Sequence, residues 1–364
     1  MSKKPVRVAL VCEPPDGGVA AHVRWLARGL PAHGYEPVVV VPHNFAHLDE
    51  LGNVCEVVTL PFRRDYSHPQ DELRAMGRLL PVLRRTTLVH AHSAKAGVLA
   101  RVVARLARKP AVYTPHLFPF IGEIPVARKR FGLFVERALA PSTAALICVC
   151  EFERGLALQK RLRPRRVAMI HNGCPPCSDG DLADMPEGLI VGTLAVLRPQ
   201  KALGYILDAM PAIKAAVPEA KLVIVGDGPA EPKLHAHAVD LGLDVTWLPF
   251  APPPARYLRS FDVYVLSSAW EAFPISVLEA QACGVPQVVS AVGGTRESVV
   301  PETGIVVPPG DPEALAEAVI QLLRDPERRA TMGEASRARQ AECFTVERMV
   351  ADTAAVYDRV IADT

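Results

Sequence analysis

Two glutamates, Glu271 and Glu279, have the residue type and the spacing to bind a substrate. They lie on either side of Pro274, which suits the first turn of a helix because its missing N–H costs nothing there. Free backbone amides around Phe273–Ser276 would point at an anion, whereas the carboxylates would accept hydrogen bonds from hydroxyl groups beside it. The pattern predicts a site for a diphosphate with a sugar on each side. The alternative is a capped, solvated helix, since glutamate is ordinary in a first turn.

Two basic residues, Arg198 and Lys201, follow an apolar run at 189–194 that is typical of a strand. Cations on a loop after a strand can neutralise a diphosphate as it leaves. We therefore expect these side chains to act on a leaving group. A solvated basic turn is the alternative for the pair taken alone.

Glycine pairs follow three further runs that are expected to be strands. Gly226 and Gly228 come after 221–225, Gly293 and Gly294 after 287–290, and Gly17 and Gly18 after 6–12. Glycine lets backbone amides approach a phosphate closely, although short glycine pairs also form ordinary turns. The loop after the first strand lacks the three-glycine form that a dinucleotide requires, which argues against a nicotinamide dehydrogenase.

His116 is the histidine best placed for chemistry, because it follows the expected strand 111–114 and is flanked by proline and aromatic residues. His90 and His92 are interpreted as structural. Cys174 and Cys177 lack the further ligands that zinc requires, so no metal site is predicted. The eight cysteines are scattered along the chain, which is typical of reduced thiols.

Short apolar runs alternate with amphipathic segments along the chain, which predicts parallel strands joined by helical crossovers. The alternation stops once, in a stretch near the middle that is rich in proline and glycine. We expect an N-terminal domain at 1–172, a linker at 173–187, a second domain at 188–344 and a terminal helix at 345–364. In such sheets ligands bind beyond the carboxyl ends of the strands, where the motifs above lie.

The composition excludes several classes of protein. Of 364 residues, 49% are hydrophobic and 22% are charged, which excludes wholesale disorder. A net charge of +2 is too small to indicate nucleic-acid binding. No apolar run reaches the roughly 18 residues of a membrane span, and the run at 6–12 is typical of a strand and not of a signal peptide. We therefore expect a cytoplasmic protein.

In their order along the chain, these motifs resemble those of the retaining GT-B glycosyltransferases of family 4, the glycosyl transferases group 1. The resemblance also rests on the stretches 89–97, 113–116, 170–173 and 282–286. It implies an α/β fold of the GT-B type, with two doubly wound, Rossmann-like domains that face a central cleft. It further implies that the terminal helix crosses back to the first domain.

The resemblance implies a role for each candidate residue. Glu279 would bind the nucleotide ribose, and Glu271 would hold hydroxyls of the donor sugar. Lys201 and Arg198 would stabilise the departing diphosphate, and His116 would line the reacting centre. Further donor contacts would come from the backbone at Gly17, Gly18, Gly226, Phe273, Pro274 and Ile275. Family members generally need no metal, so no cofactor is expected.

One departure from the family pattern concerns the arginine. The family has this residue at the position of Val196, two residues before Arg198. Either Arg198 reaches the diphosphate from a shifted position, or Lys201 acts without it.

The implied activity is transfer of a hexose or N-acetylhexosamine from a nucleotide diphosphate sugar to a hydroxyl acceptor, with retention of configuration. The expected partners are the nucleotide sugar and a glycan or lipid-linked acceptor, without nucleic acid. A basic helix bearing Phe131 and Phe134 leaves peripheral association with the inner face of the membrane as an alternative. Two other functions stay open: a GT-B-like sugar-nucleotide epimerase, and a catalytically silent sugar-nucleotide-binding protein.

Overall fold

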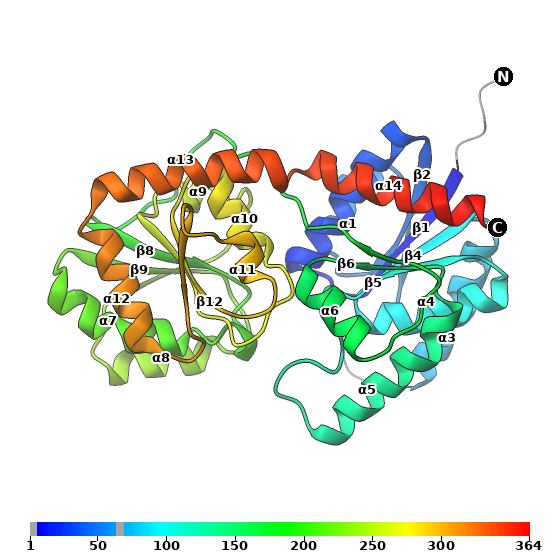
Figure 1. Ribbon diagram of the computed structural model, residues 1–364, viewed down its shortest axis with the longest axis horizontal. Helices are drawn as coiled ribbons and strands as arrows, with labels where there is room; N and C mark the ends of the chain where they lie inside the picture. The colour runs from blue at the N-terminus through cyan, green and yellow to red at the C-terminus, as the bar shows by residue number, and fades with distance from the viewer. Residues whose placement is uncertain (1–5, 63–68) are drawn as a thin grey trace. The chain divides into compact units, whose positions relative to one another are not determined.

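The computed structural model describes residues 6–62 and 69–364 (Figure 1). The chain divides into two compact units. The first unit holds the chain up to Gly173 together with Val346–Thr364, and the second holds Cys174–Thr345. Each unit is built on its own parallel sheet, which confirms the expected doubly wound α/β architecture.

Among the described residues, the sheet of the first unit has seven strands in the order β3-β2-β1-β4-β5-β6-β7. The strands are β1 Val6–Cys12, β2 Tyr35–Pro42, β3 Glu56–Leu60, β4 Leu88–His92, β5 Ala111–Thr114, β6 Ala145–Cys148 and β7 Val167–Met169. β1 and β2 are buried on successive residues because helices cover both faces of a parallel sheet. The neighbours of β1 are β2 and β4, so the chain order reverses between β1 and β4.

Helices of the first unit connect these strands and cover the sheet. They are α1 Gly17–Gly29, α2 Leu48–Gly52, α3 Pro69–Arg84, α4 Ala94–Ala107, α5 Val126–Leu139, α6 Glu151–Gln159 and α14 Val346–Ala362, with short 3-10 turns at Leu30–His33 and Ala140–Ser142. The terminal helix α14 packs on this unit beside α1 (Figure 1). Its Tyr357 hydroxyl lies 2.6 Å from Nδ1 of His90, and its Asp358 accepts a hydrogen bond from Tyr35 at 2.5 Å.

Within the described residues, the second unit has a sheet of six parallel strands in the order β10-β9-β8-β11-β12-β13. The strands are β8 Leu189–Leu194, β9 Ala220–Val225, β10 Val245–Leu248, β11 Val263–Leu266, β12 Gln287–Ser290 and β13 Gly304–Val307. Alternate residues of β9 enter two separate hydrophobic cores, Leu222 and Ile224 on one face and Val223 and Val225 on the other. The chain order reverses between β8 and β11.

The helices of the second unit follow the same alternation. They are α7 Gly204–Ala216, α8 Glu231–Asp240, α9 Ala255–Leu258, α10 Ile275–Ala282, α11 Thr295–Ser298, α12 Pro312–Leu323 and α13 Pro326–Cys343, with a 3-10 turn at Pro199–Lys201. Two of them begin with an aspartate cap: Asp311 accepts a hydrogen bond from the Ala314 amide, and Asp325 accepts one from the Arg328 amide.

The stretch expected to be a linker contains no helix or strand and is fastened to the second unit. Cys174 is buried and its amide donates to the carbonyl of Phe344 at 2.9 Å. Cys177 forms a disulfide with Cys283 at the end of α10. The expectation that all cysteines are reduced thiols is therefore wrong, because two cysteines 106 residues apart in sequence are adjacent in the fold.

No helix in the parts of the chain that the structure describes is both long enough and apolar enough to cross a membrane.

Candidate active site

The second unit brings Lys201 and Glu271 together at the carboxyl end of its sheet. Lys201 lies on the loop after β8 and Glu271 on the loop after β11, the two strands between which the chain order reverses. Lys201 Nζ donates to Glu271 Oε1 at 2.6 Å, and the Ser268 hydroxyl donates to the same oxygen at 2.8 Å. Ligands of open α/β sheets bind at such a reversal point, so this ion pair marks the candidate site.

Hydrogen bonds between the two loops fix this ion pair in place. The Gln200 carbonyl accepts from the Ala269 amide at 2.9 Å, and the Gln200 side chain donates to the Trp270 carbonyl at 3.0 Å. The Ser267 hydroxyl donates to the Lys201 carbonyl at 3.1 Å. These contacts join the loops that carry Lys201 and Glu271, and such a fixed arrangement of charges is what electrostatic stabilisation requires.

Glycines allow the loops after β9 and β12 to approach the loops that carry Lys201 and Glu271. Gly226, after β9, has φ of +126°, and a Cβ there would lie 2.0 Å from the carbonyl oxygen of Ala195. Gly293, after β12, has φ of +54°, and a Cβ there would lie 1.9 Å from the carbonyl oxygen of Glu271. Loop packing alone requires glycine at both positions. The donor contact of Gly226 stays a prediction.

Glu279 lies in α10, four residues after the first helical residue, and is partly exposed. Pro274 precedes the helix, so the expectation that it lies in the first turn is wrong by one residue. The side chains of Phe273 and Ile275 are buried, and Phe273 packs edge-on against Phe344 with ring centroids 5.4 Å apart. Burial of these side chains leaves the backbone as the part that a ligand could contact, and the donor contacts at Phe273, Pro274 and Ile275 stay predictions.

Arg198 lies at the start of the same tight turn as Lys201. Its carbonyl accepts a hydrogen bond from the Lys201 amide at 2.9 Å, and its side chain is partly exposed. The structure thus places both cations on one loop, with Lys201 on the carboxylate of Glu271.

The first unit contributes Gly17, Gly18 and His116 of the predicted residues. Gly17 has φ of +72° and opens α1, and both glycines are exposed. His116 follows β5 with φ of +55°, an uncommon conformation for a residue with a side chain. His116 therefore lies on the loop after β5, and Gly17 and Gly18 are the first two residues of α1, where the loop after β1 ends. Their contacts with a donor stay predictions.

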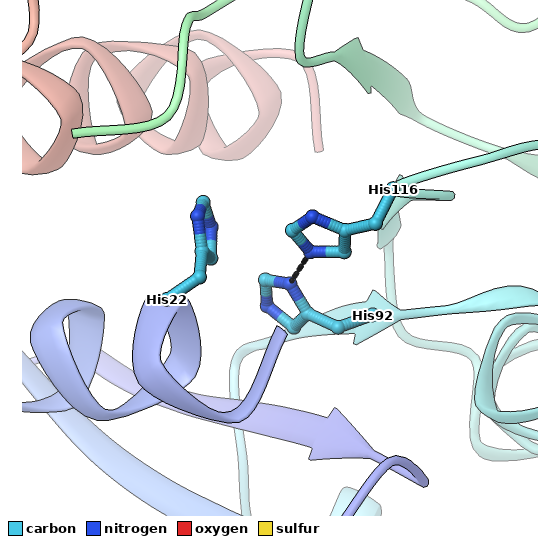
Figure 2. Close-up of side chains that lie close together, drawn as sticks. All are labelled: His22, His92 and His116. Carbon is cyan, nitrogen blue, oxygen red and sulfur yellow. Dashed lines mark hydrogen bonds between the residues drawn. The ribbon is translucent and has the colours of Figure 1, made fainter. Parts of the chain in front are cut away.

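Two further histidines lie beside His116, as Figure 2 shows. Nε2 of His116 is 3.1 Å from Nδ1 of His92, at the end of β4. The ring of His22, from α1, lies edge-on to the ring of His116 with centroids 4.7 Å apart. Sequence reasoning did not assign His22 and interpreted His92 as structural, so this grouping was missed.

Burial keeps these imidazoles uncharged. Burial lowers the pKa of His22 to about 4, although the hydrogen bond to Asn172 at 3.0 Å acts in the opposite direction. Burial, and then the charges of neighbouring histidines, hold the pKa values of His92 and His116 well below the usual value. His90 has the structural role expected of it: its ring lies 2.8 Å from Thr114 Oγ1 and 2.6 Å from Tyr357 Oη.

Comparison with known protein families identifies the family of this chain. Residues 183–339 match the family described as glycosyl transferases group 1, and residues 17–173 match the glycosyl transferase 4-like domain. The chain belongs to the glycosyl transferases group 1. The predicted family is thereby confirmed, and the candidate residues of the second unit all lie within the matched stretch.

Solved structures confirm the GT-B fold of this group 1 family member. Sucrose-phosphate synthase from Thermosynechococcus elongatus superposes with a TM-score of 0.85 at 22% identity, covering 99% of this chain and 100% of that one. HepE from Anabaena, in complex with UDP, gives a TM-score of 0.79 at 21% identity and covers 97% of this chain and 100% of its own.

Curated relatives of this group 1 chain are glycosyltransferases. An Escherichia coli UDP-Gal:alpha-D-GlcNAc-diphosphoundecaprenol alpha-1,3-galactosyltransferase is 30% identical over 257 residues, 65% of this chain and 66% of that protein. A Corynebacterium glutamicum GDP-mannose-dependent monoacylated alpha-(1-6)-phosphatidylinositol monomannoside mannosyltransferase is 39% identical over 151 residues, 39% of this chain and 40% of that protein. The chain thus spans less than two thirds of the length of either relative.

Proposed function

We propose that this chain is a retaining glycosyltransferase that moves a hexose or N-acetylhexosamine from a nucleotide diphosphate sugar to a hydroxyl acceptor. The observation that carries the proposal is the ion pair of Lys201 and Glu271, fixed at 2.6 Å across the reversal point of the second sheet. A cation beside a carboxylate suits a donor whose diphosphate needs positive charge and whose sugar hydroxyls need an acceptor.

Each residue has one task in the proposed reaction. Lys201 stabilises the negative charge that grows on the diphosphate, and Arg198 assists from the same turn. Glu271 accepts hydrogen bonds from donor-sugar hydroxyls and Glu279 from the ribose. Amides at the start of α10 contact the diphosphate. His116 lines the reacting centre.

The transfer exchanges one bond at the anomeric carbon. The acceptor hydroxyl attacks on the face from which the diphosphate leaves, and a new carbon–oxygen bond forms as the old one breaks. The bonding electron pair goes to the diphosphate oxygen, and the leaving phosphate takes the hydroxyl proton. Lys201 and the helix amides supply the charge stabilisation, so the proposed reaction needs no metal.

The proposed acceptor is a lipid-linked glycan precursor. The name of the Escherichia coli relative contains a diphosphoundecaprenol and that of the Corynebacterium relative a phosphatidylinositol, and both are lipid groups. Helix α5 supports peripheral association with an anionic membrane surface: Phe131 and Phe134 are 67% and 68% exposed, next to the basic run 128–130. Liposome co-sedimentation tests this part, with Phe131→Ser/Phe134→Ser expected to lose binding and Leu158→Ser, on the exposed surface of α6, expected to keep it.

The donor is tested by thermal shift with a panel of UDP-sugars and GDP-sugars. A donor at 100 times its dissociation constant adds about 2.7 kcal/mol of stability. Glu279→Gln should lose the shift, whereas Glu302→Gln, at an exposed position of the same unit, should keep it. NMR analysis of the product formed with a lipid-linked acceptor analogue then determines the anomeric configuration of the transferred sugar, which should be that of the donor. Turnover of the donor to an isomer without any acceptor would instead establish the epimerase.

A further inference from the structure

Three imidazoles from separate elements converge at the carboxyl end of the first sheet. His22 comes from α1, His92 from the end of β4 and His116 from the loop after β5 (Figure 2). One ring nitrogen of each lies within 4.8 Å of the others. Among residues 6–62 and 69–364, no other group of three histidine, cysteine or carboxylate side chains meets this condition.

The spacing is close to that of ligands around one ion. At zinc–nitrogen distances of about 2.0–2.1 Å, two nitrogens of a tetrahedral site lie about 3.3–3.4 Å apart. Nδ1 of His92 and Nε2 of His116 are 3.1 Å apart. A few tenths of an ångström of movement would therefore turn this contact into one edge of a tetrahedron.

A second shell of polar atoms also fits a metal. His22 Nδ1 lies 3.0 Å from the side-chain oxygen of Asn172, which accepts its proton and leaves the lone pair on Nε2. Metal-bound histidines commonly have such a partner on the other nitrogen. In the part of the chain that the structure describes, Nε2 of His92 and Oγ of Ser93 are buried without a hydrogen-bond partner. Nε2 of His92 is the ring nitrogen that does not face His116, so these two atoms call for an ordered water of the second shell and not for the ion itself.

We propose that His22, His92 and His116 bind one divalent transition-metal ion of the Zn²⁺ class. Three imidazoles without a carboxylate select borderline ions such as Zn²⁺ over Mg²⁺ and Ca²⁺, which require oxygen ligands. Three protein ligands leave a fourth position open to water or to an incoming group.

The test measures binding, so it does not depend on transferase activity. Untagged full-length protein is stripped with a chelator, dialysed and titrated with Zn²⁺ in a calorimeter. One equivalent should bind. His22→Gln, His92→Gln and His116→Gln should each weaken binding by well over tenfold, and Asn172→Ala by about 10–100-fold through loss of the second shell. His33→Gln, at the exposed end of a 3-10 turn, is the matched control and should bind as the wild type does.

A second measurement covers the case in which a variant does not fold. Co²⁺ replaces Zn²⁺ in the wild-type protein, and its visible spectrum reports the ligand geometry. Intense tetrahedral bands that Zn²⁺ displaces support the site, whereas the weak spectrum of hydrated Co²⁺ overturns it. The proposal also fails if the wild type binds no Zn²⁺, or if folded histidine variants bind it unchanged. His22, His92 and His116 would then form only a neutral hydrogen-bonded cluster.

Discussion

Lys201→Met separates a structural role of the ion pair from a catalytic one. The Glu271 side chain is 9% exposed and that of Lys201 is 18% exposed. Removing the lysine leaves the carboxylate with the Ser268 hydroxyl as its remaining described partner on Oε1. An unpaired buried polar group costs about 1–3 kcal/mol, and a fully buried charge costs more. We expect a cost of about 1–3 kcal/mol, the value for a polar group, because Lys201 is partly exposed to water. The melting temperature should fall by roughly 2–4 °C for each kcal/mol that is lost.

The double variant Lys201→Met/Glu271→Gln decides between the roles. Glutamine keeps an acceptor for Ser268 and removes the unpaired charge, so the double variant should recover about 1–2 kcal/mol of the lost stability. Glu271→Gln also removes an acceptor proposed for the donor sugar, so the reference for turnover is the Glu271→Gln single variant. If Lys201 acts on the departing diphosphate, turnover of the double variant stays about 10²-fold or more below that reference although stability returns. Calorimetry and steady-state kinetics measure the two quantities on the same samples. Recovery of turnover together with stability would refute the catalytic role. Ser268→Ala is the control, because it removes one neutral donor and should cost only about 1 kcal/mol.

Four other outcomes are expected. Glu279→Ala should weaken nucleotide-sugar binding by roughly 1–3 kcal/mol in calorimetry; unchanged affinity in a folded variant would exclude it from the donor site. Arg198→Ala should reduce turnover less than Lys201→Ala does, and the reverse order would show that Arg198 is the main cation. Transfer should persist in excess chelator, and loss of activity that a divalent ion restores would contradict the metal-free reaction. Burial raises the pKa of the Glu153 carboxyl from 4.5 to about 8, so the unfolded chain ionises first and stability falls as pH rises through this window. The free energy of unfolding of Glu153→Gln, measured by denaturant titration, should therefore gain on that of the wild type by about 1.4 kcal/mol per pH unit from pH 5 to pH 8, and a difference that does not change with pH would contradict the buried-acid explanation.

Strands and apolar helices could be predicted from the sequence because buried surfaces dictate their residues. The strands at Val6–Cys12 and Leu189–Leu194 have the predicted limits, and the helix at Val346–Ala362 lies within the stretch 345–364 where it was expected. Helix α13, Pro326–Cys343, was not predicted, and its buried residues explain why. They include Gly333, Ser336 and Gln340, so the helix lacks the apolar periodicity by which an amphipathic helix is found.

The chemistry of the second unit was more accessible to sequence reasoning than that of the first. Lys201 and Glu271 each belong to a short motif that follows a strand, and strands on either side of a reversal point bring such motifs together. His22 instead lies in the interior of α1, six residues past the aspartate that precedes the helix, where nothing local distinguishes it from a packed histidine. The pairing of Cys177 with Cys283 is equally invisible locally, because it depends on where the stretch after Gly173 lies on the second unit.

The two sheets carry different chemical groups at the same topological position, and loop packing explains the difference. In the second unit Gly226 allows the loop after β9 to touch the loop after β8, and Gly293 allows the loop after β12 to touch the loop after β11. The loops after β8 and β11 carry Lys201 and Glu271, whose charges pair at 2.6 Å. A side chain at either glycine would collide with backbone and push these loops apart, which makes both glycines positioning residues for the ion pair. In the first unit Gly17 is exposed and is the first residue of α1, so that end of the sheet offers backbone amides and neutral imidazoles. Fixed charge suits a diphosphate that must leave, whereas neutral donors and lone pairs suit hydroxyl groups or a borderline metal ion.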